Sequence, residues 1–528
     1  MDSSFSSSAF PRPRDWWLLA AFVGFLLCFA LGSRGLNEPD EGRYANIAMA
    51  MAQPGGDWWE PRQSGYGHYD KPPLIYWATA LSFRAFGLNE WAARLPPVFG
   101  AVCALAGLAW AGWRLRGARV AWWAVLICGT SVQFWTMARI LSPDMLLTGW
   151  CSLAVAAWAE GRHRGGAISL WGLSLAFWTL AFWTKATPAL IPLAGLAAGV
   201  WLTDEVAGKR ALRLPWLLPA ILLCGSPWYL AMLHRYPELR TFFFQRELAG
   251  RLAGRVDGRH GSKLYYLPIS FLGWLPWWPC GGWIIWRNRA RWFGTTWGER
   301  WQTWRQRLGI EGWIVVVGMV IFSLASSKLP SYTVLLMPWV ALVLARVIAP
   351  RALVSPQPYL LTTAGAAVMM VAALCVVPPR VESRFGVNSS LREVCRFLQA
   401  HGACRVDADR YWAGMEFYLG ADVVHSVTRI TNPPVPFVTE EMKARRIKKA
   451  HRRERDSDPG TLPDRFIEPE LWPALPPKAS LLASRSADHW WLVHFRRQQA
   501  SPFAAAIPPG ASIVRIGDFD LYQMPVPP

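Results

Sequence analysis

The sequence predicts a polytopic α-helical membrane protein with a small soluble α/β domain at its C-terminal end. Of its 528 residues, 53% are hydrophobic and only 17% are charged, which is below the usual charged share of soluble proteins. The hydrophobic residues are grouped into runs about as long as a bilayer is thick. The basic residues, which dominate a formal net charge of +20, form short clusters between these runs. This spacing favours the positive-inside rule over a nucleic-acid-binding surface.

Eleven apolar runs are long enough to predict transmembrane helices. The first, residues 16–31, follows Arg12 and Arg14. We interpret it as a span rather than a signal peptide, because no small-residue cleavage site precedes the acidic segment that follows. The others are residues 94–113, 120–137, 144–159, 167–184, 187–203, 214–233, 265–286, 313–327, 330–348 and 359–377. If the N-terminus is cytoplasmic, the basic connections all fall on the cytoplasmic side; they are residues 114–116, 161–164, 209–213, 287–307 and 346–351.

Residues 32–92 then form an external loop. Its apolar run, residues 72–86, includes Arg84 and lacks basic flanks. With only about fifteen residues it is short for a span, so we interpret it as an interfacial helix. Counting it as a further crossing would place every basic cluster outside. The odd number of spans places the C-terminus outside as well.

The apolar runs stop near Pro379, and residues 380–528 are enough for one independent domain. Residues 391–400 have helical spacing, whereas residues 480–483, 489–495 and 512–522 have short or alternating apolar stretches typical of strands. We therefore expect a transmembrane domain over residues 1–379 and an α/β domain over residues 380–528. Cys395 and Cys404 lie in the second domain, where a disulfide requires an oxidising compartment.

With this topology, polar motifs from several distant segments gather on the external rim of the membrane. A single Lys or Arg near a helix end usually extends into the lipid head groups. Carboxylates gain little at an anionic membrane surface, so a polar cavity in which acids face cations explains the whole set better. The set comprises Asp40, Glu41, Arg43, Tyr69, Asp70, Lys71, Arg139, Asp144, Lys185, Lys328 and Tyr332.

The adjacent carboxylates Asp40 and Glu41 suggest a general base, a metal ligand, or a pair whose mutual repulsion raises one pKa. Helix capping is an equally good interpretation, since acidic residues favour a helix N-terminus. Basic side chains on this rim are suited to binding phosphate; they are Arg43, Lys71, Arg139, Lys185 and Lys328.

The loop over residues 234–263 is external yet strongly basic, which breaks the sidedness rule. Arg255 lies in it, and Phe242 to Phe244 would place it at the lipid interface. We interpret it as a surface that receives an anionic lipid, the alternative being contact with head groups without chemistry.

A metal site has only weak candidates. His68 and His260 each lack a partner at ligand spacing. The sequence requires no cofactor, and a divalent metal, zinc or magnesium, is left open. No Walker loop, dinucleotide fingerprint or nucleophile elbow supports another reaction class.

Four segments are informative when taken together: PDEGRYA at residues 39–45, YDKPPL at 69–74, EWAARLP at 90–96 and SKLPSY at 327–332. Together they resemble the bacterial 4-amino-4-deoxy-L-arabinose lipid A transferases, a branch of the protein O-mannosyltransferase-like GT-C glycosyltransferases. The acidic pair is shared by the wider superfamily. The Asp-Lys-Pro-Pro and Lys-Leu-Pro-Ser-Tyr segments narrow the resemblance to this branch.

The resemblance implies a GT-C fold with thirteen spans in the bacterial inner membrane, multi-pass, with a periplasmic active site and C-terminal domain. It implies transfer of aminoarabinose from undecaprenyl phosphate to a lipid A phosphate. It also implies a catalytic role for Asp40 and Glu41, with Asp144 as second carboxylate. Phosphate binding would fall to Lys71, Arg43, Lys328 and Tyr332.

Two alternatives stay open at this point. The first is a related polyprenyl-phosphate-sugar transferase that acts on a protein or another glycan. The second is a lipid-linked sugar flippase, which should show inverted repeats and broken helices near mid-membrane. No internal repeat is evident in the sequence.

Overall fold

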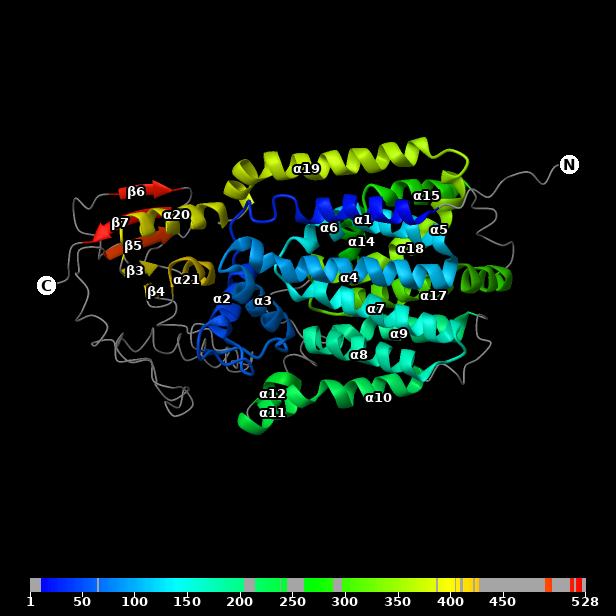
Figure 1. The fold of residues 1–528 in the computed structure, drawn as a ribbon, viewed down its shortest axis with the longest axis horizontal. Coiled ribbons are helices and arrows are strands. Elements are labelled where there is room, and N and C mark those ends of the chain that lie inside the picture. Colours follow the sequence, from blue (N-terminus) through cyan, green and yellow to red (C-terminus); the bar gives the residue numbers. More distant parts are fainter. Residues whose placement is uncertain are drawn as a thin grey trace. The chain divides into compact units, whose positions relative to one another are not determined.

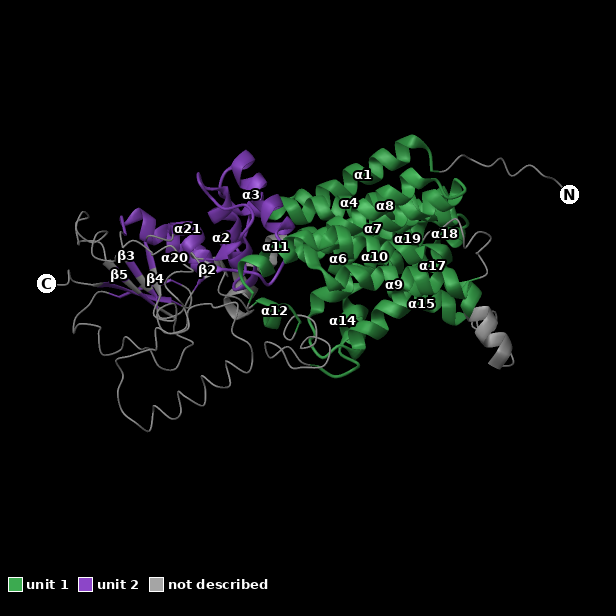
Figure 2. Ribbon diagram, turned by 90° about the horizontal axis from the view of Figure 1, so that it is seen from below, with its two compact units in different colours: residues 1–31, 94–374 green, residues 32–93, 375–528 purple. Residues whose placement is uncertain are grey.

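The structure, a computed structural model, describes most of the chain. The described residues are 11–63, 66–203, 214–237, 239–244, 261–287, 297–385, 388–403, 405–408, 412–420, 423–426, 490–495, 513–516 and 519–524. The chain divides into two units, coloured separately in Figure 2. The first contains Met1–Leu31 and Arg94–Leu374, and the second contains Gly32–Ala93 and Cys375–Pro528.

The first unit is built from helices (Figure 1). In chain order these are α1 (Pro13–Cys28), α4 (Glu90–Arg116), α5 (Ala118–Gly129), α6 (Val132–Ala138), α7 (Pro143–His163), α8 (Ile168–Lys185), η1 (Thr187–Ala189), α9 (Leu190–Leu202), α10 (Leu214–Gly225), α11 (Pro227–Arg235), α12 (Leu239–Thr241), α14 (Tyr266–Gly273), α15 (Trp277–Arg287), α17 (Trp297–Leu324), η3 (Pro330–Leu336), α18 (Met337–Ala352) and α19 (Gln357–Phe385). The first residues of α4 and the last of α19 belong to the second unit.

Helix α7 shows how sequence places a site residue in this unit. Ser142 is extended, Pro143 occupies the first helical turn, and Asp144 follows in that turn; proline and acidic residues are both favoured there. Small residues then let α7 lie close to α4, because a Cβ at Gly149 would be only 2.5 Å from the carbonyl oxygen of Gly100. Asp144 is thereby held at the start of a tightly packed helix.

The prediction of a helical membrane protein is confirmed, but the count of eleven spans is not. In the described part of the chain, four helices are long and apolar enough to cross a membrane: Glu90–Arg116, Leu214–Arg235, Arg305–Leu324 and Pro330–Ala352. A fifth candidate is the pair α5 and α6, bent by 66°. The other runs described as helices are shorter or less apolar than these candidates. Residues 72–86 are not among the candidates and form α3 (Leu74–Phe86) in the second unit.

The second unit combines a helical segment with a mixed sheet (Figure 1). The segment before α4 contains α2 (Asp40–Ala52), β1 (Arg62–Gln63), β2 (Tyr66–Gly67) and α3. The C-terminal part contains α20 (Asn388–Ala400), β3 (Arg405–Ala408), α21 (Ala413–Leu419), β4 (Val424–Ser426), β5 (Trp490–Phe495), β6 (Ile513–Ile516) and β7 (Phe519–Met524). The sheet order is β4-β3-β5-β7-β6; β3 is parallel to β4 and β5, and β7 is antiparallel to β5 and β6.

A small hydrophobic core holds this sheet to its helices. Leu391, Val394 and Leu398 of α20 are fully buried together with Val493 and Leu521 of the sheet. Their spacing along α20 places them on one face of the helix, as the sequence predicted. The small C-terminal α/β arrangement is thus present.

Two details of this unit differ from the sequence interpretation. Residues 32–92 were expected to belong to the transmembrane domain as a loop, whereas residues 32–93 group with the C-terminal residues. Strands β3 and β4 and helix α21 were not anticipated, and residues 480–483 lie outside the described part of the chain. Cys395 is a buried free thiol in α20; Cys404 also lies outside the described residues.

Candidate active site

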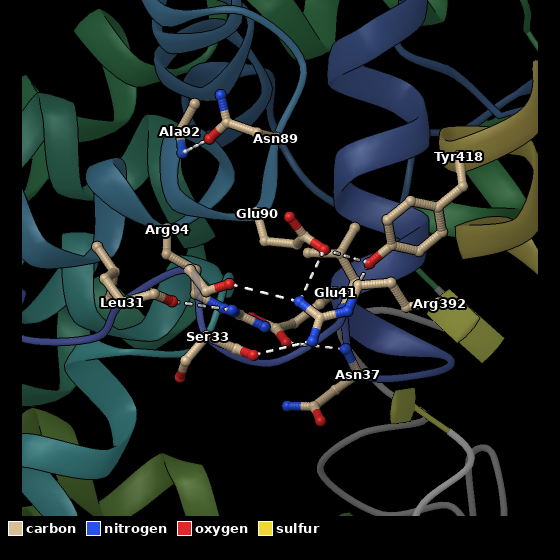
Figure 3. A network of polar contacts seen from close by, with 12 residues as sticks. Leu31, Ser33, Asn37, Glu41, Asn89, Glu90, Ala92, Arg94, Arg392 and Tyr418 are labelled. Atoms are coloured by element: carbon tan, nitrogen blue, oxygen red, sulfur yellow. Dashed lines mark hydrogen bonds and ion pairs between the residues drawn. The ribbon is translucent and has the colours of Figure 1, made fainter. Parts of the chain in front are cut away.

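Helix α2 begins with the two adjacent carboxylates, and the structure gives them different environments. The Asp40 side chain is 51% exposed, and its Oδ1 lies 2.7 Å from Nη2 of Arg43. The Glu41 side chain is fully buried and accepts a hydrogen bond from the backbone N–H of Asn37 at 2.8 Å (Figure 3). Glu41 therefore fixes the chain just before α2, which has no side-chain cap hydrogen bond of its own. Asp40 is the member of the pair that solvent or a substrate can reach.

Arg43 is surrounded by acidic and aromatic groups of the same unit. Burial alone would lower the pKa of its guanidinium, but Tyr44, Asp40 and Asp70 together hold that pKa above its usual value. The guanidinium carbon also lies 5.4 Å from the centre of the Tyr44 ring. Arg43 is consequently a permanent cation beside the exposed carboxylate of Asp40, and Asp70 acts on the same charge.

The segment before α3 is organised by a short hairpin, in which Gln63 pairs with Tyr66. Tyr69 is buried, and its hydroxyl donates to the carboxylate of buried Glu60. Lys71 donates from Nζ to the carbonyl oxygen of Asp70 at 2.8 Å. Tyr69 therefore stabilises the segment, whereas Asp70 and Lys71 come after it, immediately before α3.

The candidate metal ligand His68 lies in this segment. It is buried, and its ring lies edge-on to the Tyr76 ring with 6.3 Å between their centres. Among the described residues, no group of three His, Cys, Asp or Glu side chains is placed to hold a metal ion. His260, the other candidate, and Arg255 lie outside the described residues.

The first unit contains a group of three site residues, of which Asp144 and Lys185 are buried. Asp144 at the start of α7 forms an ion pair with Lys185 at the end of α8. The Lys185 ammonium also lies 4.6 Å from the centre of the Tyr332 ring, on η3. Three segments predicted from sequence to share a site thus meet through a carboxylate, an ammonium and an aromatic ring.

Arg139 and Lys328 of the same unit bind helix ends. Arg139 donates from Nη1 to the carbonyl oxygens of Leu26 and Leu27, at 3.3 and 2.8 Å, in the last turn of α1. Lys328 donates from Nζ to three carbonyl oxygens at the end of α17, those of Phe322, Ser323 and Ala325 at 3.2, 2.8 and 2.6 Å. Both cations satisfy carbonyls that a helix end leaves without partners.

Burial lowers the pKa of Lys328. Its ammonium also lies 5.7 Å from the centre of the Tyr266 ring. To bind phosphate, this side chain must give up the carbonyl oxygens of α17.

The predicted site residues therefore fall into two groups. Asp40, Glu41, Arg43, Tyr69, Asp70 and Lys71 belong to the second unit, and Arg139, Asp144, Lys185, Lys328 and Tyr332 belong to the first. Contacts within each group are as described above. Their union in one cavity stays a prediction.

Sequence reasoning missed several polar residues around the acidic segment. Glu38, Glu90, Arg392, Glu416 and Tyr418 all take part in hydrogen bonds of the second unit. Glu38 precedes the segment at residues 39–45, and Glu90 lies in the segment at residues 90–96. Their positions could therefore have marked them as site residues. Arg392, Glu416 and Tyr418 carry no such signal, because their partners are more than 300 residues away in sequence.

Comparison with known proteins gives a consistent result. The family model for dolichyl-phosphate-mannose-protein mannosyltransferase matches residues 70–230. An undecaprenyl phosphate-alpha-4-amino-4-deoxy-L-arabinose arabinosyl transferase from Yersinia enterocolitica is 27% identical over 342 residues, which is 62% of this chain and 58% of that protein. One of the same name from Enterobacter sp. is 29% identical over 394 residues, 72% of this chain and 68% of the relative.

Solved structures agree over nearly the whole chain. The structure of ArnT from Cupriavidus metallidurans bound to undecaprenyl phosphate superimposes with a TM-score of 0.66 and 21% identity, covering 97% of this chain and 98% of that one. The apo state of the same protein gives a TM-score of 0.64 at 20% identity, covering 96% and 97% of the two chains. These matches confirm the resemblance predicted from the sequence: the chain is similar to the aminoarabinosyl transferases and has the GT-C fold of the solved ArnT structures.

Proposed function

We propose that this protein transfers 4-amino-4-deoxy-L-arabinose from undecaprenyl phosphate to a phosphate of lipid A. The activity named for the relatives supports this proposal. Because a fold does not fix a function, the observation that carries it in this chain is the exposed carboxylate of Asp40, ion-paired with the partly buried cation Arg43. The Asp40 carboxylate can bind the cationic sugar, and the Arg43 guanidinium can bind the anionic phosphates.

The reaction exchanges one phosphate for another at the anomeric carbon. A bond forms between an oxygen of the acceptor phosphate and that carbon, while the bond to undecaprenyl phosphate breaks and its electron pair leaves with the phosphate. A phosphate monoester has a second pKa of about 6, so the acceptor is already mostly ionised near neutrality. A general base is therefore less needed than for a hydroxyl acceptor.

In this scheme Asp40 orients the ammonium group of the sugar, stabilises the positive charge that develops at the anomeric carbon, or removes a residual acceptor proton. Arg43 and Lys71 bind phosphate and reduce the repulsion between two anionic substrates. Lys185 and Tyr332 add a second cationic and aromatic contact, with Asp144 as the second carboxylate. Lys328 is the weaker phosphate ligand, since carbonyl oxygens already occupy its donors.

A turnover assay with matched variants tests the proposal. The purified protein is incubated with undecaprenyl phosphate-aminoarabinose and lipid A, and the product is weighed by mass spectrometry. We expect an added aminopentose, and we expect Asp40→Asn to lower kcat about a hundredfold or more. Glu393→Gln, which changes an exposed carboxylate on α20, is the control. Unchanged turnover and donor affinity in Asp40→Asn would show that Asp40 has no such role.

A protein acceptor is the second candidate, favoured by the match to dolichyl-phosphate-mannose-protein mannosyltransferase over residues 70–230. A hydroxyl acceptor needs a base, so kcat would then follow the titration of a carboxylate. Sugar found on protein rather than on lipid A would support this candidate. Absence of any covalent product, with sugar lipid moved across vesicles, would support a flippase instead.

The finer membrane arrangement is part of the same proposal. We propose thirteen spans in the bacterial inner membrane, with the acidic segment, Lys328 and the C-terminal domain all in the periplasm. Cysteines introduced at Asp40 and at the exposed Pro330, two residues after Lys328, should both react with a reagent that cannot cross the membrane. Labelling of the two positions from opposite sides would contradict this arrangement.

A further inference from the structure

The backbone just before Asp40 is held by side chains from the C-terminal part of the same unit. The N–H of Leu36 donates to the hydroxyl of Tyr418 at 3.1 Å. The carboxylate of Glu38 accepts a hydrogen bond from the N–H of Gly414. Arg392 donates to the carbonyl oxygen of Ser33 at 2.9 Å (Figure 3). The segment leading to Asp40 therefore has three contacts with residues at least 359 positions away.

Glu90 joins two of these contacts. It accepts from the Tyr418 hydroxyl at 3.1 Å and from Arg392 at 3.3 Å, as Figure 3 shows. Burial, followed by the Glu90 charge, raises the pKa of Tyr418, so its hydroxyl stays protonated. It can then donate to Glu90 and accept from Leu36 at the same time.

The backbone just after Asp40 is held in a similar way by α21. Asn46 of α2 donates to the fully buried carboxylate of Glu416 at 2.8 Å. A Cβ at Gly42 would lie 2.7 Å from the nitrogen of Gly414, and one at Gly414 would lie 2.3 Å from Oε1 of Glu38. Only glycine allows α2 and α21 to approach this closely.

We infer that the C-terminal domain positions the acidic site, with Tyr418, Gly414 and Glu416 as positioning residues that fix the backbone carrying Asp40. Asp40 itself is exposed, but the positions on both sides of it are anchored. A misplacement of about 1 Å can cost a hundredfold in rate when a charged group must face a reacting atom. This inference rests on the proposed function, because it assigns the C-terminal domain a part in the transfer reaction.

The variant Tyr418→Phe removes one hydroxyl while keeping the ring. We expect kcat to fall about threefold to tenfold, the size of one lost hydrogen bond, with little change in the KM for the donor. Tyr522→Phe is the control, since the described residues include no hydrogen-bond partner for its hydroxyl. Unchanged kcat in Tyr418→Phe would overturn the inference.

A double-mutant cycle separates positioning from simple stability. If Tyr418 acts through Asp40, the loss caused by Tyr418→Phe should disappear in the Asp40→Asn background. An equal loss in both backgrounds would overturn the inference and leave the proposed function intact. A wild-type protein that forms no glycosylated product would instead overturn the proposed function.

Gly414→Ala provides a second variant of the same contact. Its added methyl must displace Glu38, so we expect a larger fall in kcat than for Tyr418→Phe. Gly172→Ala is the matched control, because a Cβ there meets nothing within 4 Å. If the two alanine variants had equal kcat, the contact between α2 and α21 would not position the site.

Discussion

Asp144 forms an ion pair with Lys185 at the point where α7 begins and α8 ends. Both side chains are at most 10% exposed. The Tyr332 ring lies against the same ammonium. The two opposite charges neutralise each other within the helical unit, and this makes each dependent on its partner, because an unpaired buried charge is costly.

Asp144→Asn should destabilise the protein by about 3–5 kcal/mol, the usual cost of leaving one buried charge without its partner. The double variant Asp144→Asn with Lys185→Met should recover much of that loss. Thermal unfolding in detergent measures both. Equal melting temperatures for the wild type and Asp144→Asn would show that the pair contributes nothing to stability.

Lys328→Met tests whether this residue closes a helix or binds phosphate. Three carbonyl oxygens of α17 would lose their donor, and we expect a loss of about 1–3 kcal/mol in stability with a small change in donor KM. Thermal unfolding and steady-state kinetics check the two effects. A tenfold rise in KM at unchanged stability would instead assign Lys328 to substrate phosphate.

The same residue should give a pH effect. The pKa of Lys328 is lowered in the folded protein from the ordinary 10.5. At pH values between the folded pKa and 10.5, the unfolded chain therefore binds more protons at Lys328 than the folded chain does. The free energy of unfolding should therefore rise with pH through that window. Lys328→Met should lack this rise, and equal alkaline slopes for the two proteins would contradict the assignment.

Much of the fold could be predicted because its signals are local. Apolar runs and the helical spacing of residues 391–400 depend only on neighbours in sequence, and α20 forms there. The domain boundary could not be predicted, since residues 32–93 join the C-terminal part through contacts such as Asn46 with Glu416. Neither segment has a local sequence signal that predicts these contacts.

Prediction of the site met the same limit. Asp40 and Glu41 look alike in sequence, yet one is half exposed and the other is buried. The basic residues between the apolar runs follow the positive-inside rule, but the sequence does not show which acidic residues pair with them. Arg114 and Arg164 in fact bind Glu160, while Arg116 and Arg346 bind Glu311.

Metal removal tests the cofactor expectation. Cations of the chain neutralise phosphate in the proposed reaction, so we expect turnover to survive treatment with a chelator followed by gel filtration. If the chelator abolished activity and added zinc or magnesium restored it, a divalent cofactor would be established. A heat-treated sample with the same chelator history controls for nonspecific loss.

Glu311→Gln should destabilise the helical unit without altering the kinetics of the folded protein. The fully buried Glu311 carboxylate accepts from Arg116 at 2.8 and 3.0 Å and from Arg346 at 2.7 Å, joining α17 to α4 and α18. A neutral amide leaves two guanidiniums without a countercharge, so we expect a loss of about 3 kcal/mol or more. Thermal unfolding measures this loss, with Glu393→Gln as the exposed control. Because Arg116 and Arg346, which bind Glu311, are not predicted site residues, donor KM at low temperature should match that of the wild type. A changed KM at unchanged melting temperature would place Glu311 in the reaction rather than in the scaffold.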